Sequence, residues 1–343
     1  IGDGAFEGCT NLADIVFSQS LSIIGMRAFY GCTSLTDITL PDSVMMIDDE
    51  AFAECTCLKD VTLSQSVMYI GSYAFANCSL LTEIAIPASL MMMGDKVFQN
   101  CNALTDFYIT DLAAWCQIEA GTETKYYDYA PQRRIYLNGE LLVNVEIPEG
   151  TESIASCAFL NCKDIVSITI PESVTAVGSY AFYGCEGIVE ITVPKNVTYI
   201  GECILHECPR LTSLTLPSLS DVGAMGFYEH VEGQLLYFVD GREDSVLSEI
   251  TLTNAHTLAP NAFKDWVSLT SVTLPEGLEV IGSQAFQNCT ALTAIVIPSS
   301  VTEIGQHAFR DCTSLQSVTL QEGLLRIVWG AYDNCVSLKN IVI

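Results

Sequence analysis

Positive charge is scarce in this sequence of 343 residues. It has 14 Lys and Arg against 41 Asp and Glu, a formal net charge of −27 and a pI near 4.2. Nucleic-acid binding needs clustered Lys and Arg, and anionic membrane surfaces attract the same residues. The composition therefore argues against both partners. It fits a soluble extracellular surface, a surface that holds cations, or one that meets a basic protein.

Long apolar runs are also missing. No run reaches the ~18–20 residues that are needed to span a bilayer, so we expect no membrane insertion in this segment. Half of the residues are nevertheless apolar, which is ample for a core. The sequence starts and stops inside the repeat described below. We therefore expect a segment of a longer protein, whose signal and anchor lie outside it.

Sequence patterns of enzymes are absent too. There is no G-x-S-x-G elbow, no P-loop and no G-x-G-x-x-G. The four His residues lie in separate parts of the sequence and form no H-E-x-x-H pattern. Cys203, His206 and Cys208 are close in sequence, but the repeat accounts for the cysteines. We predict a protein with no catalytic activity, no catalytic residue and no zinc site.

A repeat fills most of the chain. Residues 295–318 read IVIPSSVTEIGQHAFRDCTSLQSV, and this segment recurs about every 23 residues. One slot is aromatic or large and apolar: Phe6, Phe29, Phe52, Phe75, Phe98, Phe159, Phe182, Leu205, Phe227, Phe263, Phe286, Phe309 and Tyr332. Three residues later a Cys follows in eleven copies: Cys9, Cys32, Cys55, Cys78, Cys101, Cys162, Cys185, Cys208, Cys289, Cys312 and Cys335. A fixed period of this length is typical of stacked structural units.

Each copy predicts one coil of a solenoid. The trio Ile38-Thr39-Leu40 alternates apolar and polar residues, which favours a half-buried strand, and Pro41 ends it. The V-x-x-I-G pattern, as in 301–305, predicts a second short extended piece, and A-F-x-x-C-x-x-L predicts a 3₁₀ or helical turn. Stacked coils bury one continuous core between neighbours. We expect one β-rich α/β solenoid domain over residues 1–343, with about 14 coils, one parallel sheet and helical turns on the other side.

The Cys slot and the strand centres each form a ladder along the stack. We interpret the Cys ladder as a buried row of small thiols, although a disulfide framework or a metal string is an alternative. The strand centres carry a ladder of Thr, which suits an exposed strand position: Thr39, Thr62, Thr169, Thr192, Thr215, Thr251, Thr273 and Thr319.

A carboxylate precedes the strand trio in five consecutive coils. These residues, which we call the acidic strip, are Asp14, Asp37, Asp60, Glu83 and Asp106. Stacking places them about 4.8 Å apart in a line on an exposed face. The strip could bind Ca²⁺ or a basic protein surface, or it could be a solvated face that blocks edge pairing. In later coils Ser is frequent at this slot, so the acidity belongs to the N-terminal third.

An insertion at about 111–144 interrupts the repeat. Asp111 is predicted to cap a helix that contains Trp115, and Asn138-Gly139 predicts a hairpin with a type I′ turn. The candidate contact residues of this insertion are Trp115, Tyr126, Tyr127, Tyr129, Arg133 and Arg134. The insertion is either a binding excursion on a rigid scaffold or a strut whose aromatics pack on the solenoid.

A second insertion covers about 228–247. It carries the candidate contact residues Tyr237 and Phe238, followed by Asp240-Gly241, which again predicts a hairpin. The acidic residues that follow could hold Ca²⁺, but they lack the EF-hand spacing.

The repeat resembles the BspA-like, treponemal type of leucine-rich repeat, whose pattern is roughly L-x-x-I-x-I-P-x-x-V-x-x-I-G-x-x-A-F-x-x-C. The resemblance covers nearly the whole chain outside the two insertions. It implies a leucine-rich-repeat fold in a bacterial cell-surface or secreted protein, with a role in adhesion or in binding a host or extracellular protein. Two alternatives stay open, which are a structural spacer of a larger surface protein and a glycan-binding module that uses the insertion aromatics.

Overall fold

The computed structural model describes residues 1–120, 132–201, 203–217 and 247–342. The chain is a β-solenoid of about 12 turns of stacked parallel strands, slightly fewer than the 14 predicted. Part of the difference arises because residues 111–144 add a strand without a Phe-x-x-Cys turn, and because the coil predicted around Phe227 lies outside the described residues. The solenoid fold predicted from the repeat is confirmed.

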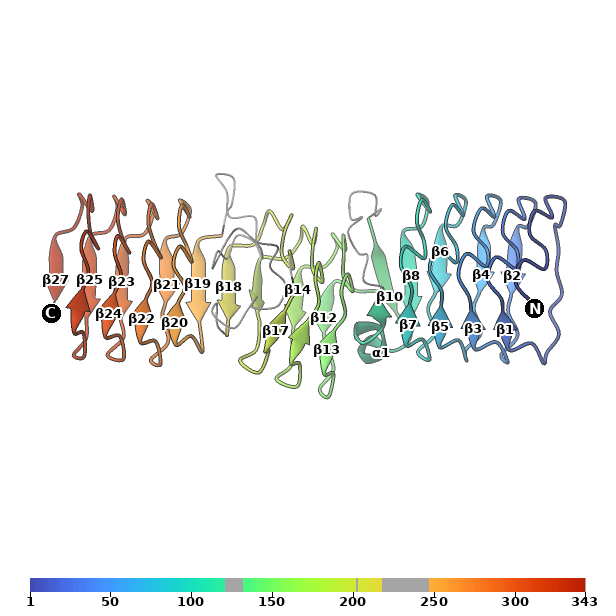
Figure 1. The fold of residues 1–343 in the computed structure, drawn as a ribbon, viewed down its shortest axis with the longest axis horizontal. Helices are drawn as coiled ribbons and strands as arrows, with labels where there is room; N and C mark the ends of the chain where they lie inside the picture. Colours follow the sequence, from blue (N-terminus) through green and yellow to red (C-terminus); the bar gives the residue numbers. More distant parts are fainter. Residues whose placement is uncertain (121–131, 202, 218–246, 343) are drawn as a thin grey trace. The chain divides into compact units, whose positions relative to one another are not determined.

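Two compact units make up the chain. Unit 1 comprises residues 1–143 and 153–164, and unit 2 comprises 144–152 and 165–343. Each is built from the same coil, in which a long strand and a short strand alternate (Figure 1). The single domain expected over residues 1–343 stays a prediction.

The long strands correspond to the predicted strand trio. In unit 1 they are β2 (Asp37–Thr39), β4 (Asp60–Thr62), β6 (Glu83–Ala85), β8 (Asp106–Ile109) and β10 (Arg134–Leu137). In unit 2 they are β12 (Asn144–Glu146), β14 (Ser167–Thr169), β16 (Glu190–Thr192), β18 (Ser213–Leu216), β19 (Glu249–Leu252), β21 (Ser271–Thr273), β23 (Ala294–Ile297), β25 (Ser317–Leu320) and β27 (Asn340–Val342). Their central apolar residue is buried and its neighbours face outward, as the alternation predicts.

The short strands form parallel sheets of their own, where the sequence predicts a single sheet. In unit 1 they are β1 (Ile23–Ile24), β3 (Met46–Ile47), β5 (Tyr69–Ile70), β7 (Met92–Met93), β9 (Glu119–Ala120) and β13 (Ser153–Ile154). In unit 2 they are β15 (Ala176–Val177), β17 (Tyr199–Ile200), β20 (Thr257–Leu258), β22 (Val280–Ile281), β24 (Glu303–Ile304) and β26 (Arg326–Ile327). Within unit 1, β1, β3, β5, β7 and β9 follow one another in a single sheet (Figure 1).

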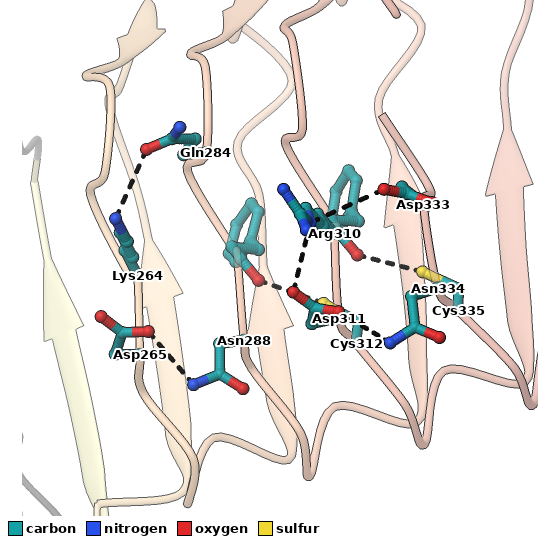
Figure 2. Close-up of polar contacts among 12 residues, drawn as sticks. Lys264, Asp265, Gln284, Asn288, Arg310, Asp311, Cys312, Asp333, Asn334 and Cys335 are labelled. Carbon is teal, nitrogen blue, oxygen red and sulfur yellow. Dashed lines mark hydrogen bonds and ion pairs between the residues drawn. The ribbon is translucent and has the colours of Figure 1, made fainter. Parts of the chain in front are cut away.

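The segment between short and long strands is not helical, which corrects the prediction of 3₁₀ or helical turns. It is a run of hydrogen-bonded turns with two left-handed residues per coil, such as Tyr73 (φ 59°) and Asn77 (φ 63°). A left-handed residue cannot continue a right-handed helix. The second of these slots favours Gly and Asn, and Gly31 occupies it with φ 70°. Its side chains also link coils, as when Asn334 Nδ2 donates to Asp311 Oδ1 at 2.8 Å (Figure 2).

The core is a stack of Phe rings. Phe29 and Phe52 lie with ring centroids 5.1 Å apart and planes 3° apart, and Phe286 and Phe309 repeat this at 5.0 Å and 6°. The Cys slot lies beside these rings, and the hydrogen bonds of its thiols explain why Cys recurs there. Cys55 Sγ donates to the carbonyl of Phe29 at 3.2 Å, and Cys312 and Cys335 make the equivalent bond at 3.1 Å and 3.0 Å (Figure 2). Nine of the eleven cysteines of this slot are buried, which confirms the predicted row of buried thiols, and all fifteen cysteines are free.

The first insertion adds to unit 1 in two ways. Helix α1 (Leu112–Cys116) begins after Asp111, whose Oδ1 accepts from the Ala114 amide at 3.0 Å, so the predicted cap is confirmed. Strand β10 pairs in parallel with β8 and turns back into β11 (Glu140–Leu141). The turn has φ 52° at Asn138 and 88° at Gly139, as a type I′ hairpin requires.

Candidate functional site

The acidic strip lies on the exposed face of the long strands of unit 1. The Cα of Asp37 is paired with that of Asp60, and Glu83 is paired with Asp106. Asp37, Asp60 and Glu83 are exposed, and Asp106 is half-buried. Asp14 is exposed as well but precedes the first long strand. The predicted line of carboxylates therefore exists from β2 to β8, with like charges directly opposite each other.

The insertion supplies a cation at the end of this line. In strand β10, Arg134 is paired with Asp106 across the sheet. Its Nε donates to Asp106 Oδ1 at 2.6 Å and its Nη2 to Oδ2 at 2.9 Å, a bidentate ion pair. The hydrogen bond and the charge of Asp106 raise the pKa of Arg134, so it stays fully charged. In the described part of the chain, this is the one ion pair that an acidic-strip residue makes.

A pair of tyrosines lies beside this ion pair. Tyr108 of β8 and Tyr136 of β10 are neighbours across the sheet, and their rings stack with centroids 4.8 Å apart and planes 18° apart. Both rings are half-buried and share the outer face with Asp106 and Arg134. Burial raises the pKa of Tyr108, and the carboxylates of Glu83 and Asp106 raise it further. The result is an aromatic surface next to concentrated negative charge.

The sequence pattern did not predict these tyrosines as candidate site residues. Tyr108 occupies the slot that Thr39 and Thr62 fill in earlier coils. This break in the Thr ladder is the signal that could have found it. Tyr136 had no comparable signal, because its position opposite Tyr108 depends on where the insertion returns to the sheet.

The described candidate contacts of the first insertion are part of the structure of unit 1. Trp115, one of the candidate contact residues, is buried at 5 % exposure, and its indole Nε1 donates to the carbonyl of Ala158 at 3.0 Å. Arg133 lies over the ring of Phe107, 5.4 Å from its centroid, and donates to the carbonyl of Cys157. Both residues therefore brace the insertion against the coils, in the way that the strut interpretation predicts.

The remaining candidate contact residues lie outside the described residues. They are Tyr126, Tyr127 and Tyr129 of the first insertion and Tyr237 and Phe238 of the second. Their proposed roles stay predictions.

Metal ligands do not gather in the described ranges. No group of three His, Cys, Asp or Glu side chains there could hold an ion. Three of the buried thiols are also poor ligands at neutral pH, because burial raises the pKa of Cys55, Cys162 and Cys208 to about 12. Ca²⁺ binding by the acidic strip stays a prediction. Among the helices of the described residues, none is both long and apolar enough to cross a membrane.

The surface built from the acidic strip, Arg134 and the two tyrosines is suited to recognition. Carboxylates attract cationic groups, and a tyrosine face can stack on a guanidinium or pack on apolar groups. The strands that carry these side chains are rigid elements, so the groups are held in place before a partner arrives.

Comparisons with known proteins find similar solved structures. No curated protein matches the sequence. A solved leucine-rich repeat protein from Bacteroides ovatus is similar at 26 % identity and a TM-score of 0.65, over 99 % of this chain and 81 % of that one. One from Eubacterium ventriosum is 26 % identical, covering 84 % and 80 %, with a TM-score of 0.48. A leucine rich cell surface protein from Faecalibacterium prausnitzii is 23 % identical, covering 96 % and 85 %, with a TM-score of 0.32.

A family model decides the identity of the repeat. The model of the BspA type leucine rich repeat region matches six copies over residues 1–116, 133–235 and 243–343. These ranges cover nearly all of the chain and contain every Phe-x-x-Cys turn described above. The chain belongs to the BspA-type leucine-rich repeat family.

Proposed function

We propose that this chain is the protein-binding scaffold of a cell-surface or secreted protein and acts in adhesion. Its binding surface is the outer face of β2, β4, β6, β8 and β10. The observation that carries the proposal is the direct opposition of carboxylates, Asp37 to Asp60 and Glu83 to Asp106. Like charges directly opposite on a sheet are destabilising, so a function that uses them accounts for their presence.

The chemistry of the surface defines the class of partner. Asp37, Asp60 and Glu83 are exposed, whereas Asp106 is already paired with Arg134. A partner with Lys or Arg at a similar spacing would relieve the repulsion between the exposed carboxylates. Tyr108 and Tyr136 supply an aromatic surface at the end of the row. We therefore propose an extracellular or host protein with a basic surface as the partner, and no catalytic activity for this chain.

The test is a binding screen against extracellular-matrix and mucosal proteins at low and high salt. The variant is Asp37→Asn with Asp60→Asn and Glu83→Gln, which leaves the ion pair of Asp106 intact. The matched control is Glu190→Gln with Glu249→Gln, because these residues occupy the same slot in unit 2. We expect salt-sensitive binding that the first variant loses and the control keeps. Binding that survives the first variant, or no binding by the wild type, would overturn the proposal.

The spacer function is the second candidate, and the burial of Trp115 favours it. A binding excursion would present its aromatic residue to solvent, whereas Trp115 packs in the core and bonds to Ala158. If the whole panel fails to bind while the chain is stable, the spacer becomes the better proposal. The glycan-binding alternative rests on the insertion aromatics, all of which lie outside the described residues except the buried Trp115. A glycan array with Tyr127→Ala and Tyr237→Ala variants would test it.

A further inference from the structure

Exposed methionines form a row directly before the short strands β3, β5 and β7 of unit 1. Met45, Met68 and Met91 occupy the same slot in three successive coils and are 49 %, 46 % and 60 % exposed. The amide of Met68 donates to the carbonyl of Met45, and that of Met91 to the carbonyl of Met68, so the three residues are direct neighbours. We call these three residues the Met column.

A second apolar row widens the Met column. The next slot holds Ile23, Met46, Tyr69 and Met92, which are register partners across β1, β3, β5 and β7. Ile23 and Met92 are exposed, and the other two are half-buried. A single exposed apolar side chain needs no explanation, but a contiguous apolar surface of this kind is typical of an interaction site.

Unit 2 shows that the fold does not need methionine at this slot. The equivalent residues there include Thr175, Thr198 and Thr302. Each Thr hydroxyl donates to a backbone carbonyl of the preceding coil, at 3.2 Å for Thr175, 3.3 Å for Thr198 and 3.2 Å for Thr302. A polar residue at this slot therefore adds a hydrogen bond between coils. The methionines of unit 1 forgo that bond and expose apolar surface instead.

Negative charge borders the apolar surface. Asp48 and Asp49 follow β3 directly, and both are half-buried. Burial raises the pKa of Tyr69, and the charges of Asp49 and Asp48 raise it further, so its hydroxyl lies within the field of both carboxylates. The first 116 residues contain only three basic residues, Arg27, Lys59 and Lys96. The surface formed by the Met column and its neighbouring row therefore has an acidic border. Its middle is apolar and carries the flexible side chains of methionine.

We propose that the Met column and its neighbouring row bind a protein segment that presents apolar side chains next to Lys or Arg. Methionine is unbranched and polarisable, so it adapts its shape to varied apolar side chains. The carboxylates of Asp48 and Asp49 are placed to attract the basic residues of such a segment. This site lies on the short strands and the residues directly before them, whereas Asp37, Asp60, Glu83 and Asp106 of the acidic strip lie on the long strands, so the two sites can be tested independently.

The test uses a synthetic peptide of Lys and Leu patterned as an amphipathic helix. Two further peptides isolate each requirement: in one Glu replaces Lys, and in the other Ser replaces Leu. The variant is Met45→Thr with Met68→Thr and Met91→Thr. Because Thr occurs at the equivalent slot of unit 2, this variant should fold, which circular dichroism and thermal unfolding will check. The control variant replaces the same three methionines by Leu and keeps the apolar surface.

We expect the Lys–Leu peptide to bind the wild type and to shift the ¹³C-methyl resonances of Met45, Met68 and Met91 in NMR spectra. The Thr variant should bind at least about tenfold more weakly, a difference of about 1.4 kcal/mol. The Leu variant should bind as the wild type does, and the other two peptides should bind weakly.

Several results would overturn the proposal. Equal binding by the Thr variant would place the peptide elsewhere, and equal binding of the Glu peptide would remove the role of charge. Loss of binding in the Leu variant would point to thioether chemistry rather than to an apolar surface. Dissociation of a wild-type oligomer in the Thr variant, measured by analytical ultracentrifugation, would make a second copy of this chain the occupant. Binding to neutral phospholipid vesicles but not to the peptide would indicate a membrane surface instead.

Discussion

Equivalent exposed slots of the two units carry different side chains on coils that are built alike. On the long strands of unit 1, carboxylates face each other directly, as Asp37 and Asp60 do. On those of unit 2, Glu190 faces Ser213, which in turn faces Glu249, so the carboxylates alternate with serine. At the slot directly before the short strands, Met45, Met68 and Met91 of unit 1 correspond in unit 2 to residues that include Thr175, Thr198 and Thr302. The same backbone accepts both solutions, so the surface of unit 1 reflects more than the needs of folding.

The largest effect should come from the core that both units share. Phe52→Ala in unit 1 and Phe286→Ala in unit 2 each remove a fully buried ring from the stack. Each should lower the free energy of unfolding by about 3–5 kcal/mol. Urea unfolding of both variants measures this, with Phe→Leu at the same positions as the milder control. A loss confined to one unit would show that the two cores are not equivalent.

The buried thiols predict a loss of stability at alkaline pH in both units. Burial raises the pKa of Cys55 in unit 1 and of Cys208 in unit 2 from 9.0 to about 12. The protonated thiol is favoured in the folded state, so its contribution is complete below pH 9 and is lost as the pH rises from 9 to 12. Urea midpoints from pH 8 to 11 should fall accordingly.

The control for the alkaline loss is Cys55→Ala. It removes one titrating thiol, so the decline above pH 9 should be less steep than in the wild type. An unchanged slope in this variant would assign the decline to other groups. Thiol reagents at pH 8 give an independent measure, because exposed Cys9 should react well before buried Cys55.

The ion pair of the insertion distinguishes unit 1 from unit 2 by a smaller amount. Arg134→Met removes the bidentate contact to Asp106 and keeps most of the apolar side chain. Since the Arg134 side chain is 42 % exposed and solvent screens the pair, the loss of stability should be small. Thermal unfolding measures this loss of stability. Arg134→Lys should be less destabilising than Arg134→Met, because Lys keeps the positive charge but cannot make the bidentate contact to Asp106. A fully stable Arg134→Met variant would argue that the pair contributes nothing.

The smallest effect should be a gain. Asp60→Ser gives unit 1 the alternation of unit 2 and should raise the free energy of unfolding by about 0.2–1 kcal/mol at low salt. The gain should disappear in ~1 M salt, where the Debye length is about 3 Å. Ser213→Asp in unit 2 is the reverse change and should be destabilising by a similar amount. If neither substitution responds to salt, repulsion along the strip is too weak to support the proposed function.

Features that repeat or act locally could be predicted from the sequence. The period near 23 residues predicts the coil and its buried thiols, Asp111 predicts its own helix cap, and Asn138-Gly139 predicts its own turn. The left-handed conformation of Arg27 and Tyr73 could not be predicted, because neither residue type favours it. The coil enforces that conformation through hydrogen bonds to its neighbours.

The candidate site depended on contacts between distant residues. Asp106 and Arg134 are 28 positions apart, and the insertion between them follows no repeat, so no period relates the two side chains. The stacking of Tyr108 on Tyr136 depends on the same register between β8 and β10. The repeat period predicts contacts between residues only where the spacing between successive copies is constant.

The constant spacing also restricts how this chain can change in length. The bond from Asn77 to Glu54 spans 23 residues, and the bond from Cys78 to the carbonyl of Phe52 spans 26, with equivalents in other coils. Removal of one whole coil keeps the register, so most of the remaining Phe and Cys residues still lie next to a residue of the same type in the neighbouring coil. Removal of a single residue leaves its coil mismatched against both neighbours. The reach of this protein can therefore grow or shrink in whole coils, one strand spacing of about 4.8 Å at a time.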